Sequence, residues 1–315
     1  MKRWLFIICV LLQLLTIGYI LYRFKKKTQN TLGTSIKVID SKSIKRTPHG
    51  DLKYYYEPIA DTISHESDNI LPGKYTINKD TFNERFNYTP QKPDKVYRVM
   101  SIGDSYTFGM FVDTDRNWSE QLEDKLRTSC IKYGSYDVIN LGVYAYDFAY
   151  EVERFINRGN KYSPDHIVWL VVHFERMTDA IEGEMRSIKE NLKRTKTEAE
   201  ITKITNKPYN IWLQASEQLK KKISHEENIN YQNKQLKRFF SEYRGKVLFV
   251  LTPWISEEGE QMLKSYNTHD NVNIIRLSNN IMNLHFPTDT HPNVEGHKFI
   301  ANEVFDYLDK ENLCR

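Results

Sequence analysis

A serine, an aspartate and a histidine in two separate stretches of this chain have the types and spacing of a nucleophilic catalytic site. Ser105 lies in "RVMSIGDSYTFG", directly after an apolar run, and Asp289 and His291 lie in "FPTDTHPNVEGH" near the C-terminus. A serine hydroxyl becomes a good nucleophile only when a histidine takes its proton and a third group holds that histidine in the right tautomer. An aspartate two residues before a histidine can accept its Nδ1–H and leave Nε2 facing the serine. Each stretch is weak by itself, because a serine in a turn is more often a helix cap than a nucleophile.

The surrounding sequence predicts a sheet that would bring these stretches together. Short apolar runs alternate with segments whose apolar residues recur at helical spacing, which is typical of a parallel sheet covered by helices on both faces. Because sites in such sheets lie at the carboxyl ends of the strands, Ser105 is expected at that edge. Gly159 is expected to end the second helix. Strands are expected at 96–103, 136–143, 166–174, 245–253 and 271–278, and helices at 118–130, 146–160 and 294–312.

Taken in order along the chain, three blocks resemble those of the SGNH hydrolases, the GDSL-type esterases and lipases. "GDSYTFG" is similar to the first family block, "NLGVYAYD" to the second and "DTHPNVEGHKFIA" to the last, and the resemblance extends over residues 74–308. It implies an α/β/α sandwich with a central parallel sheet, in which Ser105 is the nucleophile, His291 the base and Asp289 the group that orients the base. It also implies an oxyanion hole formed by the backbone N–H groups of Ser105 and Gly142.

A second histidine, His297, is the rival base. It falls one turn into the predicted last helix, where family members often carry a histidine without a catalytic role. His291 is therefore the predicted base.

The third family block does not match. Members of the family usually place an asparagine directly after the third strand, and its amide donates a hydrogen bond to the oxyanion. Aligning "SPDHIVWLVV" with the family strand puts Glu175 at this position and Arg176 after it. An ionised Glu175 would place negative charge beside a developing oxyanion. Three interpretations stay open: Glu175 is protonated by burial and donates like an amide, Arg176 or His173 supplies the donor, or the site is impaired.

The resemblance implies a serine esterase that acts through an acyl-enzyme on Ser105, without a metal or cofactor. Its substrates would be acyl esters, among them O-acetyl esters, of a glycan or a lipid. Transfer of the acyl group to another alcohol uses the same first half-reaction, so an O-acyltransferase is one alternative. A site impaired at Glu175 would leave a catalytically silent glycan-binding or scaffold protein, which is the other.

The N-terminal residues 1–27 predict a single-pass membrane anchor. The stretch "WLFIICVLLQLLTIGYILY" holds about 19 residues without a charge, close to the length that a helix needs to cross a bilayer. A cleaved signal peptide is the alternative, but no small-x-small cleavage site follows the stretch. Basic residues flank both of its ends, and their distribution leans slightly towards a cytoplasmic domain. Proteins with a short N-terminal tail before a single anchor often export their domain regardless, so we expect the catalytic domain outside the cytoplasm.

Behind the anchor, residues 28–73 are polar and predict a stalk, and residues 74–315 predict the hydrolase-like domain. A mildly basic insertion with helical propensity, at about 180–238, interrupts this domain. Most charges of the insertion are expected on a solvated helix face. The alternative is a lid, or a docking surface for an anionic partner or lipid headgroups.

Composition and cysteines bound the function further. A formal net charge of +4 gives no case for nucleic acid as a partner. Forty per cent hydrophobic and 27% charged residues are ordinary for a globular protein and exclude a largely disordered chain. Cys9 lies in the anchor, and Cys130 and Cys314 alone cannot make a disulfide framework, so the cysteines do not indicate a compartment.

Overall fold

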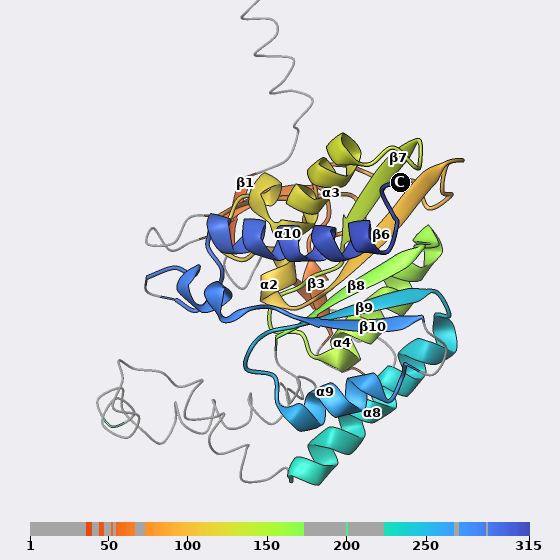
Figure 1. Cartoon of the computed structure of the whole chain (residues 1–315). Helices are drawn as coiled ribbons and strands as arrows, with labels where there is room; N and C mark the ends of the chain where they lie inside the picture. The colour runs from red at the N-terminus through yellow and green to blue at the C-terminus, as the bar shows by residue number, and fades with distance from the viewer. Residues whose placement is uncertain are drawn as a thin grey trace, which may run out of the picture. The chain divides into compact units, whose positions relative to one another are not determined.

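A five-stranded sheet lies at the centre of the computed structural model, which describes residues 36–39, 44–46, 52, 55–66, 73–172, 200, 224–267, 271–287 and 289–315. The strand order is β10-β9-β8-β6-β7, and each neighbouring pair is parallel (Figure 1). The parallel sheet predicted from the alternating pattern is therefore confirmed. The strands are β6 (Val96–Gly103), β7 (Ser135–Asn140), β8 (His166–Val171), β9 (Lys246–Leu251) and β10 (Val272–Arg276).

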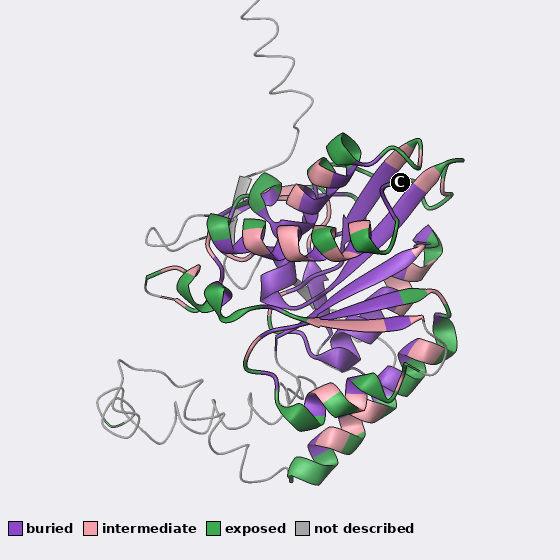
Figure 2. Cartoon of the chain, in the orientation of Figure 1, coloured by how far each residue is buried: buried purple, intermediate pink, exposed green. Residues whose placement is uncertain are grey.

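Helices cover both faces of this sheet. Side chains of successive strand residues point to opposite faces, so Met100 and Ile102 of β6 belong to one apolar core and Val99 to the other. Strands β6, β7, β8 and β9 are buried over most of their length, whereas β10, at the edge of the sheet, is largely half-buried (Figure 2). Helices α4 (Phe148–Arg154), α8 (His225–Glu242) and α9 (Glu257–Lys264) contribute to the first core, and α3 (Trp118–Ser129) and α10 (Val294–Lys310) to the second.

Side-chain caps fix where the two helices of the second core begin. The Asn117 side chain accepts a hydrogen bond from Glu120 N at the start of α3, and the Asn293 side chain accepts one from Gly296 N at the start of α10, both at 3.0 Å. Such a cap satisfies one of the free N–H groups of the first turn. Both helices begin where the sequence predicted.

The second predicted helix does not end at Gly159, so that prediction is wrong. After α4 the chain continues through a π-helical turn (Phe155–Gly159) and a 3₁₀ turn (Asn160–Tyr162), and it leaves the helical conformation at Ser163, which has a φ of 48°. Gly159 itself has a φ of −82°. A Cβ atom there would lie 2.6 Å from Leu141 Cδ2 and 2.7 Å from Met100 Sδ. The glycine therefore lets the helix approach the sheet closely.

Part of the segment predicted as a stalk packs against the domain. Tyr55 and Tyr56 are buried, and their rings lie against Tyr146 and Tyr150 with centroids 5.2–6.0 Å apart. The Tyr56 hydroxyl also donates to the carbonyl oxygen of Tyr144, at 2.6 Å. These contacts attach residues 55–58 to the loop that follows β7. The small strands of this region are β1 (Ile36–Ile39), β4 (Thr62–Glu66) and β5 (Lys74–Ile77) in one sheet, and β2 (Ile44–Arg46) and β3 (Tyr56–Pro58) in another.

Two predicted segments lie wholly or largely outside the described residues. The predicted anchor, 1–27, is one of them, and among the residues that are described no helix has the length and apolarity to span a bilayer. Of the predicted insertion, 180–238, the structure describes residue 200 and residues 224–238. The latter belong to α8, whose Leu236 is buried in the first core.

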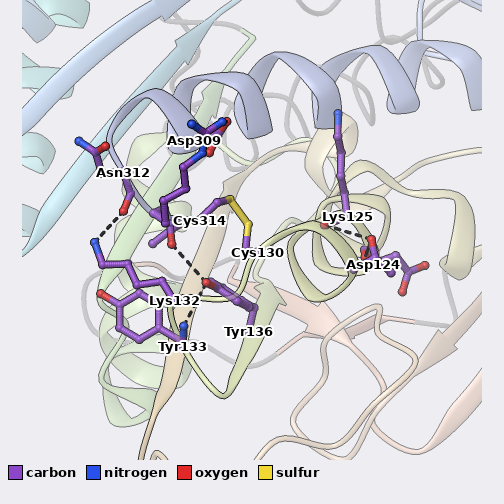
Figure 3. Close-up of a disulfide and its surroundings, with 12 residues drawn as sticks. Asp124, Lys125, Cys130, Lys132, Tyr133, Tyr136, Asp309, Asn312 and Cys314 are labelled. Carbon is purple, nitrogen blue, oxygen red and sulfur yellow. Dashed lines mark hydrogen bonds and ion pairs between the residues drawn. A yellow bond between two sulfur atoms is a disulfide. The ribbon is translucent and has the colours of Figure 1, made fainter.

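A disulfide between Cys130 and Cys314 joins the end of α3 to the end of the chain (Figure 3). The sequence did not predict this pairing, because the two cysteines are 184 residues apart. Hydrogen bonds surround it: Ile131 N donates to Cys314 O at 3.1 Å, and the Tyr136 hydroxyl donates to Leu313 O at 3.2 Å. Both cysteines are buried, so the bond belongs to the packed end of the second core.

Replacing both cysteines, Cys130→Ala with Cys314→Ala, is expected to lower the free energy of unfolding by about 2–5 kcal/mol, because the bond closes a long loop in the unfolded chain. Urea unfolding of the two proteins measures this difference. A reductant should lower the stability of the wild type to that of the double variant and leave the variant unchanged. Equal stability with and without the reductant would show that the bond contributes nothing.

Candidate active site

Ser105 stands at the carboxyl end of β6, as the sequence predicted, and begins the short helix α2 (Ser105–Phe108). The Asp104 side chain caps this helix by accepting a hydrogen bond from Tyr106 N at 3.0 Å. Asp104 therefore serves as the cap, which leaves the neighbouring Ser105 hydroxyl to another partner. Ser105 is 7% exposed.

The three residues predicted from spacing and resemblance lie in one hydrogen-bonded row. His291 Nε2 lies 2.8 Å from Ser105 Oγ, although the two residues are 186 positions apart in the chain. His291 Nδ1 makes a short hydrogen bond to Asp289 Oδ1, and the same oxygen accepts from His291 N at 2.8 Å. With the proton on Nδ1, His291 donates to Asp289 and presents the Nε2 lone pair to the serine hydroxyl. This is the arrangement that activates a serine nucleophile.

Aromatic side chains hold the histidine loop in place. The Tyr106 hydroxyl donates to Thr290 O at 2.6 Å, and burial raises the pKa of this phenol, so it stays a neutral donor. The rings of Tyr106 and Phe111 lie 5.4 and 5.2 Å from the His291 ring, centroid to centroid. Tyr106 thus ties the segment of Ser105 to the segment of His291. This contact was not predicted from the sequence, although Tyr106 adjoins Ser105 in the first block.

His297, the rival base, is fully buried in α10. Neither of its ring nitrogens has a hydrogen-bond partner among the described residues. Burial lowers its pKa to about 3, so the ring is neutral at physiological pH. His291, and not His297, makes the hydrogen bond to Ser105.

Gly142 lies directly against helix α2, which begins at Ser105. A Cβ atom on Gly142 would be 2.2 Å from Phe108 N and 2.5 Å from Thr107 C, so only glycine permits this contact between backbones. Its N–H donates to Asn140 Oδ1 at 2.9 Å, and Asn140 Nδ2 donates to Thr107 O at 2.8 Å. The role of the Gly142 N–H in an oxyanion hole stays a prediction, and an oxyanion would have to share this donor with Asn140.

The residues predicted at the third block, Glu175 with Arg176 and His173, lie outside the described residues. The description of this strand end stops at Val172, one residue beyond β8. The identity of the third oxyanion donor therefore stays a prediction.

A buried carboxyl group, that of Glu84, is hydrogen-bonded to the backbone of Asn140. Glu84 is fully buried and accepts a short hydrogen bond from Asn140 N. Burial, together with the neighbouring carboxylates of Glu120 and Glu123, raises the pKa of Glu84 well above its usual range. Burial at this position therefore favours the neutral form of the Glu84 carboxyl group over the ionised form. Among the residues that the structure describes, no cluster of three or more His, Cys, Asp and Glu side chains could hold a metal ion.

Solved structures resemble the chain, whereas no family model and no curated protein sequence matches it. TesA is 13% identical, with 67% of this chain and 97% of that chain covered and a TM-score of 0.40. The lipase/acylhydrolase from Enterococcus faecalis is also 13% identical, with 68% and 96% covered and a TM-score of 0.40. The family 3 carbohydrate esterase from Clostridium thermocellum is 14% identical, with 70% and 100% covered and a TM-score of 0.38. At these identities the likeness assigns no residue a role, so the chemistry of the site rests on its own geometry.

The substitution Glu84→Gln is expected to change how stability depends on pH. The pKa of Glu84 is higher in the folded protein than in the unfolded chain, where it is about 4.5, so the contribution of Glu84 to the free energy of unfolding falls as pH rises from 4.5 towards the raised pKa. Glutamine cannot ionise, so the stability of the variant relative to the wild type should increase with pH. Urea unfolding between pH 5 and 9 measures this, with the exposed Glu242→Gln as control. A difference that stays constant over this range would contradict the raised pKa of Glu84.

Proposed function

We propose that the chain is a serine esterase that hydrolyses acyl esters through an acyl-enzyme on Ser105. One observation carries the proposal: Ser105 Oγ lies 2.8 Å from His291 Nε2, and His291 Nδ1 is hydrogen-bonded to Asp289. A buried serine can lose its proton to a histidine only if that histidine is held in one orientation and one tautomer. The Asp289 carboxylate and the Tyr106–Thr290 hydrogen bond supply that restraint.

The proposed reaction has two halves. Ser105 Oγ attacks the ester carbonyl carbon while His291 Nε2 takes the hydroxyl proton, and Asp289 stabilises the imidazolium that forms. When the tetrahedral intermediate collapses, the bond to the alcohol oxygen breaks and His291 returns the proton to that oxygen. Water then attacks the acyl-enzyme with His291 again as base. The bond between the acyl carbon and Ser105 Oγ breaks, His291 returns the proton to Oγ, and the carboxylic acid leaves. An acyltransferase would differ only in this second half, because another alcohol would replace the water.

The oxyanion of the intermediate would be stabilised by the backbone N–H groups of Ser105 and Gly142. Glu175 would stand where related enzymes carry an asparagine donor. An ionised carboxylate there would repel the oxyanion, so an active site of this kind needs Glu175 in its protonated form, or a donor from Arg176 or His173.

The substrates would be acyl esters, O-acetyl esters among them, of a glycan or a lipid. We also propose that the chain carries a single N-terminal membrane anchor and that the esterase domain lies outside the cytoplasm. The Cys130–Cys314 disulfide supports this side of the membrane, because disulfides form and persist in oxidising compartments.

Turnover of p-nitrophenyl acetate by the full chain tests the proposed function. Ser105→Ala should lower kcat by roughly 10⁴–10⁶-fold, since it removes the nucleophile, and Asp289→Asn by roughly 10⁴-fold, since it disturbs the histidine tautomer. Ser241→Ala, an exposed serine at the end of α8, is the control and should leave kcat unchanged. Wild-type turnover in Ser105→Ala would contradict the proposal. A folded wild type without turnover would favour the catalytically silent glycan-binding alternative.

Glu175→Asn tests the oxyanion hole separately. If Glu175 is ionised and repels the oxyanion, replacing it with an amide should raise kcat by roughly 10-fold or more, because one such donor contributes about 10²–10³-fold to the rate. The same assay measures the gain. Glu175→Gln introduces the same amide on a longer side chain, so comparing the two variants shows whether the position of the amide matters. If kcat falls in both variants, Glu175 is itself the working donor and the view that it impairs the site is wrong.

A further inference from the structure

An exposed tryptophan is linked to His291 through the ring of Tyr106. Trp254 follows β9 at the carboxyl edge of the sheet, the same edge at which Ser105 follows β6. Its ring lies 6.2 Å from the Tyr106 ring, which in turn lies 5.4 Å from the His291 ring. Trp254 is 43% exposed, although it is among the largest apolar side chains of the chain.

Hydrogen bonds fix the loop that carries this side chain. Nη1 of Arg276 lies within hydrogen-bond distance of three carbonyl oxygens of the loop, those of Thr252 and Pro253 at 3.1 Å and Ile255 at 3.2 Å. Nη2 of Arg276 makes an ion pair with Glu260 of α9, so the guanidinium is itself anchored. The indole Nε1 donates to Val172 O at 2.8 Å. Trp254 is therefore held in one orientation, with its polar edge satisfied by the protein.

The held orientation distinguishes Trp254 from the other exposed apolar side chains. Among the described residues, the exposed large hydrophobic side chains are Phe86, Ile131, Trp254, Met282 and Val294. The ring of Phe86, the other aromatic side chain in this group, lies against Tyr88 and the guanidinium groups of Arg85 and Arg127. Of Phe86 and Trp254, only Trp254 is connected by ring contacts to His291, through the ring of Tyr106. An apolar surface that is fixed but left open beside a nucleophile points to a ligand that covers it.

The chemistry of that ligand follows from the shape of the surface. A long acyl chain needs a continuous apolar strip, whereas two exposed residues of these loops, Ser256 two positions after Trp254 and Thr290 next to His291, are polar. A sugar ring has one flat face of C–H bonds and a polar rim of hydroxyl groups. The C–H bonds carry partial positive charge and match the negative face of an indole ring.

We propose that Trp254 is a stacking platform for a sugar ring of an acylated glycan, and that Arg276 is the positioning residue that holds the platform. The proposal rests on the proposed esterase function and names its substrate class. In the reaction the bond between the acyl carbon and a glycan oxygen breaks, the acyl group passes to Ser105 Oγ, and His291 delivers the serine proton to the glycan oxygen. Water then releases the carboxylic acid from Ser105.

The test compares two substrates on the full chain, O-acetylated xylo-oligosaccharide and p-nitrophenyl acetate, which has no sugar ring. In Trp254→Ala the ratio of the two kcat/KM values should fall roughly 3- to 10-fold, because stacking on the ring is lost. Trp254→Phe keeps a flat ring and should restore most of the ratio. Phe86→Ala removes an exposed aromatic ring elsewhere and should leave the ratio at the wild-type value.

If Trp254→Ala does not fold, a binding measurement replaces the comparison of the two kcat/KM values. Ser105→Ala is titrated with the oligosaccharide, and a change in tryptophan fluorescence is expected that disappears in Ser105→Ala with Trp254→Phe. A ratio that Trp254→Ala leaves unchanged would overturn the proposal, as would a wild type that prefers a medium-chain monoacylglycerol to the oligosaccharide. Turnover of p-nitrophenyl acetate without turnover of the glycan would overturn the glycan assignment alone. Turnover of neither ester would overturn the esterase function as well.

Discussion

The hydrogen bond between Ser105 Oγ and His291 Nε2 is the interaction on which this site depends, and the two residues come from distant parts of the chain. Ser105 is fixed by β6, which lies inside the sheet between β7 and β8 and is buried on both faces. His291 lies on a loop, which needs other restraints. Phe286 N donates to His291 O at 3.1 Å, Asn293 N donates to Leu284 O at 3.0 Å, and Tyr106 binds Thr290. These hydrogen bonds join the two sides of the loop to each other and attach the loop to Tyr106.

Further side chains hold the backbone around Ser105 in place. Glu84 binds the backbone of Asn140, and Asn140 joins Gly142 to Thr107 in helix α2. On the other side of the site, Arg276 holds the loop of Trp254. Each of these groups is a polar side chain that satisfies backbone groups at the carboxyl edge of the sheet. An edge built in this way holds Ser105, His291 and the ring of Trp254 in place before any ligand binds.

Local patterns predicted much of the fold, because the spacing of apolar residues within β6, α3 and α10 already indicates which of their side chains are buried. The resemblance of two blocks also brought Ser105, Asp289 and His291 together correctly. The features that the sequence did not predict depend on distant partners. Gly159 looked like a helix end but is a glycine because Met100 and Leu141 lie against it. Three further contacts likewise join segments far apart in sequence: the Cys130–Cys314 bond, the packing of Tyr55 against Tyr146, and the hydrogen bond from Asn140 to Glu84.

The most direct test of the account identifies which atom of the folded chain reacts. The full chain is treated with a fluorophosphonate, digested, and its peptides are mapped by mass spectrometry, with an unfolded sample treated in parallel. Because the activation of Ser105 would depend on His291 in the folded state, we expect one phosphonyl adduct, on Ser105, which is absent from the unfolded sample and from His291→Ala. A folded chain without an adduct, or with its adduct on another residue, would contradict it.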